Sequence, residues 1–545
     1  MSAIQQLLTD HIDIWTAAET EKKSGRGRAS GNAGSVYGIK KLRELILELA
    51  VRGKLVPQDQ EWKNLKLIDL GFWAIGSGFP TAEQGCQNDE ILFVKVSDMN
   101  LAGNEKFIVV SNNTISNETA KRLRINVHSI GTVIFPKIGG AISTNKRRIL
   151  TRNTAIDNNC LGLSPKAGVS TDWLYLLLSS IDLSKYQAGT SVPALAQGVL
   201  QEIPVILPCE EEQHRIVGKV DELMALCDQL ESQHSNAAEA HEKLVSHLLG
   251  TLTQSQNAKY FSANWQRIAA HFDTLFTTDA SIDALKQTLL QLAVMGKLVP
   301  QDANDEPASE LLKRIQAEKA KLIAEGKIKK DKPLPPITDD EKPFELPDGW
   351  AWVRFNDLIN PAYLISYGVL VPGADEKDGI PFVRIADLDI HNPPEKPEKS
   401  ISREIDCQFE RTRLEGGEIL MGVVGSIGKL GIAPNSWKGA NIARAICRIK
   451  VSDSLSRDYV VILLQSQFMQ SSFLGDTKTL AQPTLNIGLI RLSLTPLPTM
   501  SEQHRIVTKV DELMALCDQL KSRITDASRW QQKLADVMTA GAISS

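Results

Sequence analysis

The chain has 545 residues, with 61 Lys and Arg against 65 Asp and Glu and a formal net charge of −4. Its hydrophobic content of 42% and charged content of 23% are those of an ordinary globular protein, and its length is too great for one core. Runs of about 18 apolar residues and a basic start followed by an apolar stretch are both missing from the sequence. Wholesale disorder is excluded, and we expect a cytoplasmic protein of about three or four domains, without a membrane partner.

The first element that the sequence predicts is a helix at the N-terminal side. The stretch LRELILELAV has leucines at helical spacing and is followed by Gly53 and Pro57, which together form a helix-stop signal. The segment 42–59 returns at 285–302 with 12 of 18 positions identical, including its final GKLVPQD. We assign residues 1–60 to an N-terminal helical repeat.

A second repeat is almost perfect. EQHRIVGKVDELMALCDQL (212–230) returns at 502–520 with one difference, Gly218 against Thr508. Apolar residues at alternating spacings of four and three predict a coiled-coil seam and two antiparallel helices of about 35 residues, each about 50 Å long. A plain dimerising coiled coil would show the same pattern, but it would not require two different blocks in one chain.

The predicted seam extends along both copies, through the spacer regions 211–302 and 501–545. In the first copy it contains Ile216, Val220, Leu223, Cys227, Leu230, His234, Ala237, His241, Leu244 and Leu248. In the second copy it contains Ile506, Val510, Leu513, Cys517, Leu520, Ile524, Ala527 and Leu534. The residues expected to hold the spacer and its assembly together are Ile216, Val220, Leu223, Leu230, Ile506, Val510, Leu513 and Leu520.

Two blocks of different sequence, 61–210 and 346–500, lie between the repeats and share landmarks in the same order. ILFVKVSDMN corresponds to IPFVRIADLD, GTVIFPKIGG to GEILMGVVGS, and DWLYLLLSS to DYVVILLQS. The first two pairs predict strands and the last a short buried helix. We interpret the blocks as divergent copies of one domain. The predicted fold class is α+β or mixed, with two α/β domains separated by long antiparallel coiled-coil helices in pseudo-twofold order.

Positive charge is concentrated locally within the blocks. Lys and Arg number 14 against 11 Asp and Glu between residues 62 and 208, and 16 against 16 between residues 350 and 498. Phosphates and base edges both favour Lys and Arg, so these clusters predict contacts with nucleic acid. The predicted DNA-binding residues are Lys95, Lys137, Lys146, Arg147, Arg148, Arg152, Arg384, Arg411, Arg413, Lys429 and Arg444.

Residues 303–345 form an extra segment without a counterpart in the first half. It predicts an amphipathic helix, with Leu311, Ile315 and Leu322 on one side, followed by a proline-rich linker. Between residues 310 and 332, Lys and Arg outnumber acidic residues by eight to four. Two interpretations stay open, a solvated helix with a tether and an arm that docks on a partner.

Short motifs that could indicate catalysis lack essential parts. The Asn-Pro-Pro turn before Glu395 lacks the aromatic residue with which adenine methyltransferases stack a flipped base. GSIGK, ending at Lys429, has neither the spacing nor the hydroxyl of a P-loop. Seven cysteines form no CxxC pair, and His234 and His241 lack a third ligand. We expect no catalytic, cofactor-binding or metal-binding residues in this chain.

Taken in order, the EQHRIV helices, the GKLVPQD helix ends, the PFVRIADL strand and the GSIGK turn resemble the specificity subunit of type I restriction-modification enzymes. The resemblance spans almost the entire chain. It implies two target recognition domains, each reading one half of a bipartite, asymmetric sequence in double-stranded DNA, and helices that space them and bind two methyltransferase subunits. It also implies that S-adenosylmethionine, ATP and Mg are used only in partner subunits, namely the methyltransferase and the restriction and translocase subunits.

Two other function classes stay open at this point. The chain could be a stand-alone DNA methyltransferase or nuclease, which methyl transfer or cleavage by the purified chain would reveal. It could also be a protein scaffold without DNA binding, which a binding assay with random duplexes would distinguish.

Overall fold

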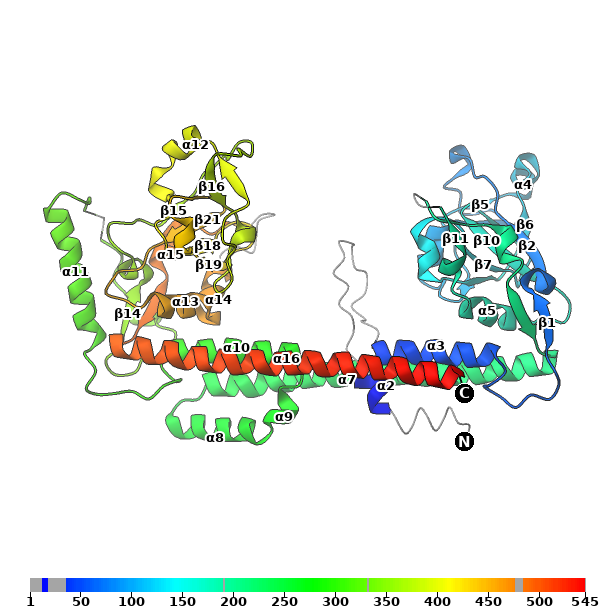
Figure 1. Cartoon of the computed structure of the whole chain (residues 1–545), viewed down its shortest axis with the longest axis horizontal. Helices are drawn as coiled ribbons and strands as arrows, with labels where there is room; N and C mark the ends of the chain where they lie inside the picture. The colour runs from blue at the N-terminus through cyan, green and yellow to red at the C-terminus, as the bar shows by residue number, and fades with distance from the viewer. Residues whose placement is uncertain (1–11, 18–35, 190–191, 331–332, 476–483, 545) are drawn as a thin grey trace. The chain divides into compact units, whose positions relative to one another are not determined.

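Figure 1 shows the computed structural model of the chain, which describes residues 12–17, 36–189, 192–330, 333–475 and 484–544. The chain divides into two compact units, the first made of residues 1–238 and 526–545 and the second of residues 239–525. Each unit contains one sheet-rich domain. We name the one within residues 61–210 the first head and the one within residues 346–500 the second head.

Two long helices belong to both units. The helix α7 (Glu210–Thr253) begins in the first unit and ends in the second, whereas α16 (Met500–Ser544) begins in the second and ends in the first. Each carries one copy of the near-perfect repeat in its first turns. They contain 44 and 45 residues, so they are longer than the roughly 35 residues expected from the apolar pattern.

The first head consists of short strands and helices. Its strands are β1 (Lys63–Lys66), β2 (Gly71–Ile75), β3 (Ile91–Val94), β4 (Phe107–Ile108), β5 (Thr114–Ile115), β6 (Val127–His128), β7 (Val133–Pro136), β8 (Arg148–Leu150), β9 (Thr154–Ile156), β10 (Cys160–Pro165), β11 (Gln187–Ala188), β12 (Ala194–Leu195) and β13 (Pro204–Leu207). Its helices are α4 (Asn117–Leu123), α5 (Thr171–Ser180) and α6 (Gln197–Leu200). The sheets have the strand orders β2-β10-β7-β8-β4, β5-β3-β9-β6, β11-β12 and β1-β13.

The second head has the same kinds of elements. Its strands are β14 (Ala351–Arg354), β15 (Ser366–Tyr367), β16 (Ile380–Val383), β17 (Lys399–Ile401), β18 (Ile419–Gly422), β19 (Leu430–Ile432), β20 (Asn441–Ile442), β21 (Ile446–Ile449) and β22 (Leu494–Leu497). Its helices are α12 (Arg403–Gln408), α13 (Arg457–Gln465), α14 (Gln467–Gly475) and α15 (Ile487–Leu492). The sheets have the orders β15-β21-β18-β19, β17-β16-β20 and β14-β22.

Corresponding strands pair in the same way in the two heads, which confirms that the heads are divergent copies of one domain. β3 and β16 each form a parallel pair, with β9 and β20. β7 and β18 each form an antiparallel pair, with β10 and β21. The first and last strands of each head, β1 with β13 and β14 with β22, also pair antiparallel. Each head is thereby closed just before its long helix begins.

The predicted apolar strands and short helices are confirmed. β3 and β7, with sequences ILFV and VIFP, are buried along their whole length, as expected of strands covered on both faces. α5 begins after Ser170, whose hydroxyl accepts a hydrogen bond from the Trp173 N–H, and α13 begins after Ser456 in the same way. Both helices bury leucines against the helical part of their own unit.

In the first unit, α3 (Tyr37–Val51) packs with α5, with the start of α7 and with the end of α16 (Figure 1). The predicted spacer residues Ile216, Val220, Leu223 and Leu230 are buried in this core. Arg43 on α3 bridges to Asp228 and Glu231 on α7 at 2.7 and 2.9 Å.

In the second unit, α10 (Asp279–Val294) occupies the place that α3 has in the first. It packs with the end of α7, with the start of α16, and with α8 (Ala258–Ala270) and α9 (Phe272–Leu275). The predicted spacer residues Ile506 and Val510 are buried, and Leu513 and Leu520 are half-buried. The sequence pattern did not predict α8 and α9.

The predicted seam on α7 is wrong at most positions beyond Leu230, although its last residue, Leu248, is half-buried and packs in the core of the second unit. His234 and Ala237 are exposed, and Leu244 is 49% exposed, whereas Val245 and Leu252 are buried. A strict seven-residue repeat drifts by about 20° per heptad on an ideal helix, so four heptads after Ile216 the drift is about 80°, or nearly one residue. The buried positions follow the 3.6-residue period of an ordinary helix.

Both helix-stop signals are confirmed. Gly53 and Gly296 have φ of +70° and +67°, a left-handed conformation that favours glycine. A side chain at either position would also meet the indole of a tryptophan, Trp62 or Trp350, with Cζ2 at 3.1 Å in both cases. Each repeat therefore ends against the tryptophan that directly precedes the first strand of its head.

The extra segment forms α11 (Ala308–Ala324), which confirms the predicted amphipathic helix. Leu311 and Ile315 are buried in the core of the second head, and Leu322 is half-buried. The backbone N–H of Ala308 donates to the Gly349 carbonyl at 2.8 Å. The first turns of α11 thus pack against the second head.

Candidate nucleic-acid interface

The predicted basic cluster of the first head lies at the start of β8. Lys146 is half-buried, and its ammonium group donates to the Asn100 side chain. Arg148 donates to the carbonyls of Arg147 and Met99 at 2.7 and 2.8 Å. Burial lowers the pKa of Arg148 from its ordinary value. These two side chains are already engaged with the head, although part of each stays at the surface.

Arg147 lies inside the first head, which corrects its predicted place at the interface. Its side chain is 2% exposed, and it donates to the carbonyls of Leu178 and Ile181 at 2.9 and 3.1 Å. These carbonyls belong to the C-terminal end of α5, where a helix leaves acceptors without intrahelical donors. Its guanidinium also lies 5.3 Å from the centre of the Phe135 ring, and burial lowers its pKa to about 9. Arg147 is therefore a buried helix cap.

The other predicted cations of the first head differ in whether their side chains already have partners within the protein. Lys95 donates to Gln84 Oε1 at 2.6 Å and lies 5.6 Å from the centre of the Phe79 ring. Lys137 is half-buried and Arg152 is exposed, and within the described part of the chain neither side chain has a hydrogen-bond or ion-pair partner. Arg152 is thus the most available of these cations for a phosphate.

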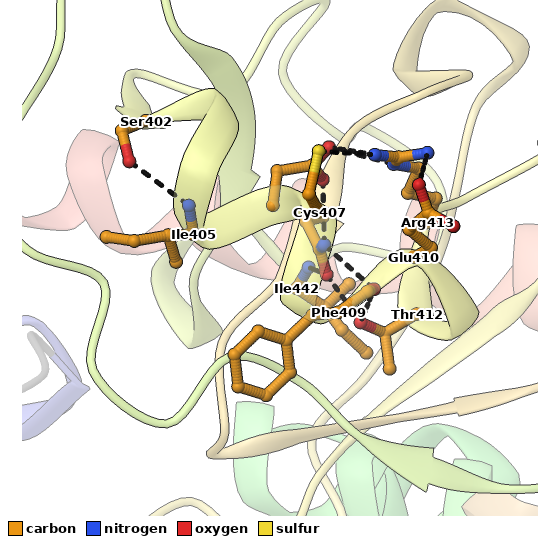
Figure 2. Close-up of polar contacts among 10 residues, drawn as sticks. Ser402, Ile405, Cys407, Phe409, Glu410, Thr412, Arg413 and Ile442 are labelled. Carbon is orange, nitrogen blue, oxygen red and sulfur yellow. Dashed lines mark hydrogen bonds and ion pairs between the residues drawn. The ribbon is translucent and has the colours of Figure 1, made fainter.

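In the second head, two of the predicted arginines are tied to carboxylates. Arg384 pairs with Glu398 at 3.0 Å and with Asp387 at 3.5 Å. Figure 2 shows Arg413 directed toward α12, where its Nε donates to the buried Asp406 at 2.8 Å, and the hydrogen bond raises the pKa of Arg413. These pairs hold loops together, and their carboxylates neutralise positive charge that would otherwise attract the phosphates of DNA.

The remaining predicted cations of the second head are exposed. Lys429 donates to the Ile385 carbonyl at 2.8 Å. Arg411 and Arg444 have no side-chain partner among the residues with described positions. Arg444 follows β20, and its backbone N–H donates to the Val369 carbonyl at 2.9 Å. The structure therefore separates free cations from those that stabilise the fold, which local charge counts could not do.

Sequence reasoning missed Asp406, the residue that positions Arg413. Asp406 is 2% exposed and accepts hydrogen bonds from Arg413 and from Asn441 Nδ2, the latter at 3.0 Å. It also missed Leu370 and Val371, which are exposed beside Arg444. The only signal for the first case was a seven-residue spacing between Asp406 and Arg413. The apolar pair reads as an ordinary strand end.

The GSIGK turn is a hairpin connection between β18 and β19, which pair antiparallel, so it does not precede a helix as a phosphate-binding loop does. Within the described ranges, no group of three or more His, Cys, Asp and Glu side chains is placed to hold a metal ion. No helix among the residues that the structure describes is both long and apolar enough to cross a bilayer.

Comparison with known proteins accounts for the repeated architecture. The family model for the type I restriction modification DNA specificity domain matches the chain twice, at residues 59–240 and 347–527. The chain is 35% identical to the type I restriction enzyme EcoAI specificity subunit from Escherichia coli, over 99% of this chain and 100% of the relative. It is 34% identical to the EcoEI specificity subunit from the same organism, with the same coverage.

Among solved structures, the HsdS subunit from Thermoanaerobacter tengcongensis aligns with 18% identity over 90% of this chain and 98% of that chain, with a TM-score of 0.40. Each matched segment of the family model includes one head and the start of the long helix that follows it. The double match and the full-length relatives establish that the chain belongs to the family of type I restriction-modification specificity subunits.

Proposed function

We propose that the chain is the non-catalytic DNA-recognition subunit of a cytoplasmic type I restriction-modification complex. Each head reads one half of a bipartite target in double-stranded DNA, and the helices space the heads and bind two methyltransferase subunits. Restriction and translocase subunits join that complex. S-adenosylmethionine, ATP and Mg act in the partners. The observation that carries this proposal is that two divergent heads are each followed by a long helix whose first turns, 212–230 and 502–520, are nearly identical in sequence.

The divergence of the heads supports a role in reading different sequences. They share strand pairing, yet their surface cations stand at different places: Arg152 in the first head, and Arg411 and Arg444 in the second. Phosphate contacts fix the register of a protein on DNA, and base contacts choose the sequence. Two domains with one fold and different surfaces suit two different half-targets.

The near-identity of the stretches 212–230 and 502–520 supports a role in binding the same partner twice. Buried repeat residues such as Leu223 are identical for packing reasons alone. Exposed residues are identical too, including Leu226 and Leu516, which are 37% and 55% exposed. An apolar residue retained at the surface in both copies fits two copies of one partner better than it fits a solvent-exposed spacer.

Exchange of one head tests the proposal. A chain whose residues 62–208 are replaced by the corresponding block of another family member should, with methyltransferase partners, methylate a target changed in one half only. The reciprocal exchange of residues 350–498 is the matched control, and it should change the other half. Selection of duplexes from a random pool, followed by sequencing, reads both results. An unchanged target after either exchange would refute recognition by that head.

A further inference from the structure

The second head carries an exposed apolar tip, defined as Leu370 and Val371, which follows β15. These neighbouring side chains are 55% and 70% exposed. Isolated exposed aliphatic residues are ordinary in proteins, so exposure alone indicates nothing. What sets this pair apart is that the structure holds it outside, next to unpaired cations.

Both ends of the tip loop are fixed to the head. Before the tip, Val369 is 1% exposed, forms a parallel bridge with Ala443 and packs in a cluster with Phe409 of the α12 region. After it, Asp375 accepts hydrogen bonds from the Ser400 N–H at 3.0 Å and from Lys399 Nζ at 2.8 Å. The loop therefore begins at a residue buried in the head and ends at a carboxylate bound to β17.

Between these anchors, the backbone leaves the tip little freedom. Pro372 follows the tip directly, and its ring fixes φ. Gly373 then has φ of +71°, and a side chain there would meet Ile405 Cδ1 at 3.0 Å. A preorganised loop loses little conformational entropy on binding, which suits a contact surface.

Positive charge lies beside the tip. Arg444 follows Ala443, and its backbone N–H donates to the carbonyl of Val369, the residue before the tip. Arg411 stands two residues after Phe409, which packs against the apolar cluster that contains Val369. Both guanidinium groups are exposed and lack side-chain partners in the described segments. Apolar atoms flanked by free guanidinium groups complement a DNA groove, because phosphates line both sides of every groove.

The chemistry of the major groove indicates which group of the DNA an apolar tip would contact. In the major groove, the C5-methyl group of thymine is the apolar feature by which a base pair is distinguished. We propose that Leu370 and Val371 contact a thymine methyl group in the half-target of the second head while Arg444 binds an adjacent phosphate. This inference rests on the proposed function of the second head as a DNA reader.

The first head provides a contrast. Ser77 forms the parallel bridge with Asp157 that corresponds to the bridge of Val369. There the chain continues with Gly78 and Phe79, and the Phe79 ring stacks on Phe93 with centroids 3.7 Å apart. The apolar side chain thus turns into the first head. The thymine contact belongs to the second head.

The test uses the full chain assembled with its methyltransferase partners. Duplexes are selected from a random pool, and the half-target of the second head is identified by the head exchange described above. If no sequence is enriched, the proposed function itself fails. If a target emerges, each thymine of that half is replaced in turn by uracil, which removes only the methyl group, and affinity is measured at fixed salt.

At one position, uracil should weaken binding by the unchanged chain about fourfold, the value expected for one buried methyl group. The double variant Leu370→Ala/Val371→Ala should bind thymine and uracil duplexes equally. Leu489→Ala, a matched control at a 40% exposed leucine of α15, should keep the full discrimination. Discrimination that survives in the double variant, a wild-type chain insensitive to every uracil, or a half-target without an A·T pair would each overturn the inference. If the wild-type chain is insensitive to every uracil but the double variant binds DNA more weakly, the tip inserts between base steps as an apolar wedge instead.

Discussion

The indole Nε1 of Trp350 donates a hydrogen bond to Glu502 Oε2 at 2.6 Å, joining the residue just before β14 to the first turn of α16. Gln301 donates to the other carboxylate oxygen, also at 2.6 Å. The first unit contains the same residue types at Trp62 and Glu212, but within the described residues Trp62 Nε1 and Glu212 Oε1 have no hydrogen-bond partner. One head is therefore bonded to its helix at this point, and the corresponding bond in the other unit is unmade.

This difference predicts unequal effects of one substitution. Trp350→Phe removes a donor from a buried carboxylate and should lower the free energy of local unfolding in the second unit by about 2 kcal/mol more than Trp62→Phe does in the first. Trp62→Phe is the matched control, because it removes the same ring volume without breaking a bond. Hydrogen exchange of the β14 and β22 amides, compared with that of β1 and β13, measures both effects. Equal losses would contradict the distinction.

Glu502 also predicts a pH dependence. Burial raises its pKa above the ordinary 4.5, although the hydrogen bonds from Trp350 and Gln301 act in the opposite direction. Between 4.5 and the raised pKa, the native state binds more protons than the unfolded chain, so the contribution of Glu502 to the free energy of unfolding falls as pH rises. Below 4.5 both states are protonated and the penalty disappears.

Glu502→Gln removes this titration. The free energy of unfolding of the unchanged chain minus that of the variant should therefore decrease as pH is raised above the ordinary pKa of 4.5. Urea denaturation at a series of pH values, followed by tryptophan fluorescence, gives the difference. A difference that is constant with pH would show that Glu502 does not titrate in this range.

The sequence predicted those features of the fold that depend on local pattern. The helix stop at Gly53, the apolar runs of β3 and β7, and the short buried helix α5 were all predicted from spacing and residue type. Each is determined by neighbours in the chain, so no knowledge of distant contacts was needed. The pseudo-twofold order followed from the repeats for the same reason.

The sequence could not predict features that depend on distant contacts. Arg147 looked like its neighbours in a basic run, and only the end of α5, some thirty residues later, explains its burial. The seam beyond Leu230 was misplaced because a heptad was extended where the helix keeps its ordinary period. The exposure of Leu370 could not be predicted, because it and the buried Val369 are both aliphatic and only the distant bridge of Val369 to Ala443 distinguishes them.

Arg147 and Arg152 provide a matched test of burial against exposure in the first head. Arg147→Ala leaves the α5 carbonyls without their donor and should lower the free energy of unfolding by roughly 2–3 kcal/mol, with the salt dependence of DNA binding unchanged while the head is folded. Arg152→Ala should change stability by less than about 0.5 kcal/mol and reduce the slope of log affinity against log salt by about 0.9. If the folded Arg147→Ala variant shows a reduced slope, Arg147 contacts DNA and its assignment as a buried helix cap is wrong.

The repeated surface leucines predict the stoichiometry of the complex. Leu226→Asp or Leu516→Asp places a charge on an exposed apolar position, so the helix should stay folded while one of two methyltransferase subunits is lost. The combined variant should bind neither. Leu223→Asp, at a position only 1% exposed, is the contrasting change, because a buried charge should disrupt the helical core of the first unit. Native mass spectrometry counts the bound subunits, and circular dichroism reports helix content. If the combined variant still carries two methyltransferase subunits, the partners bind elsewhere on the chain.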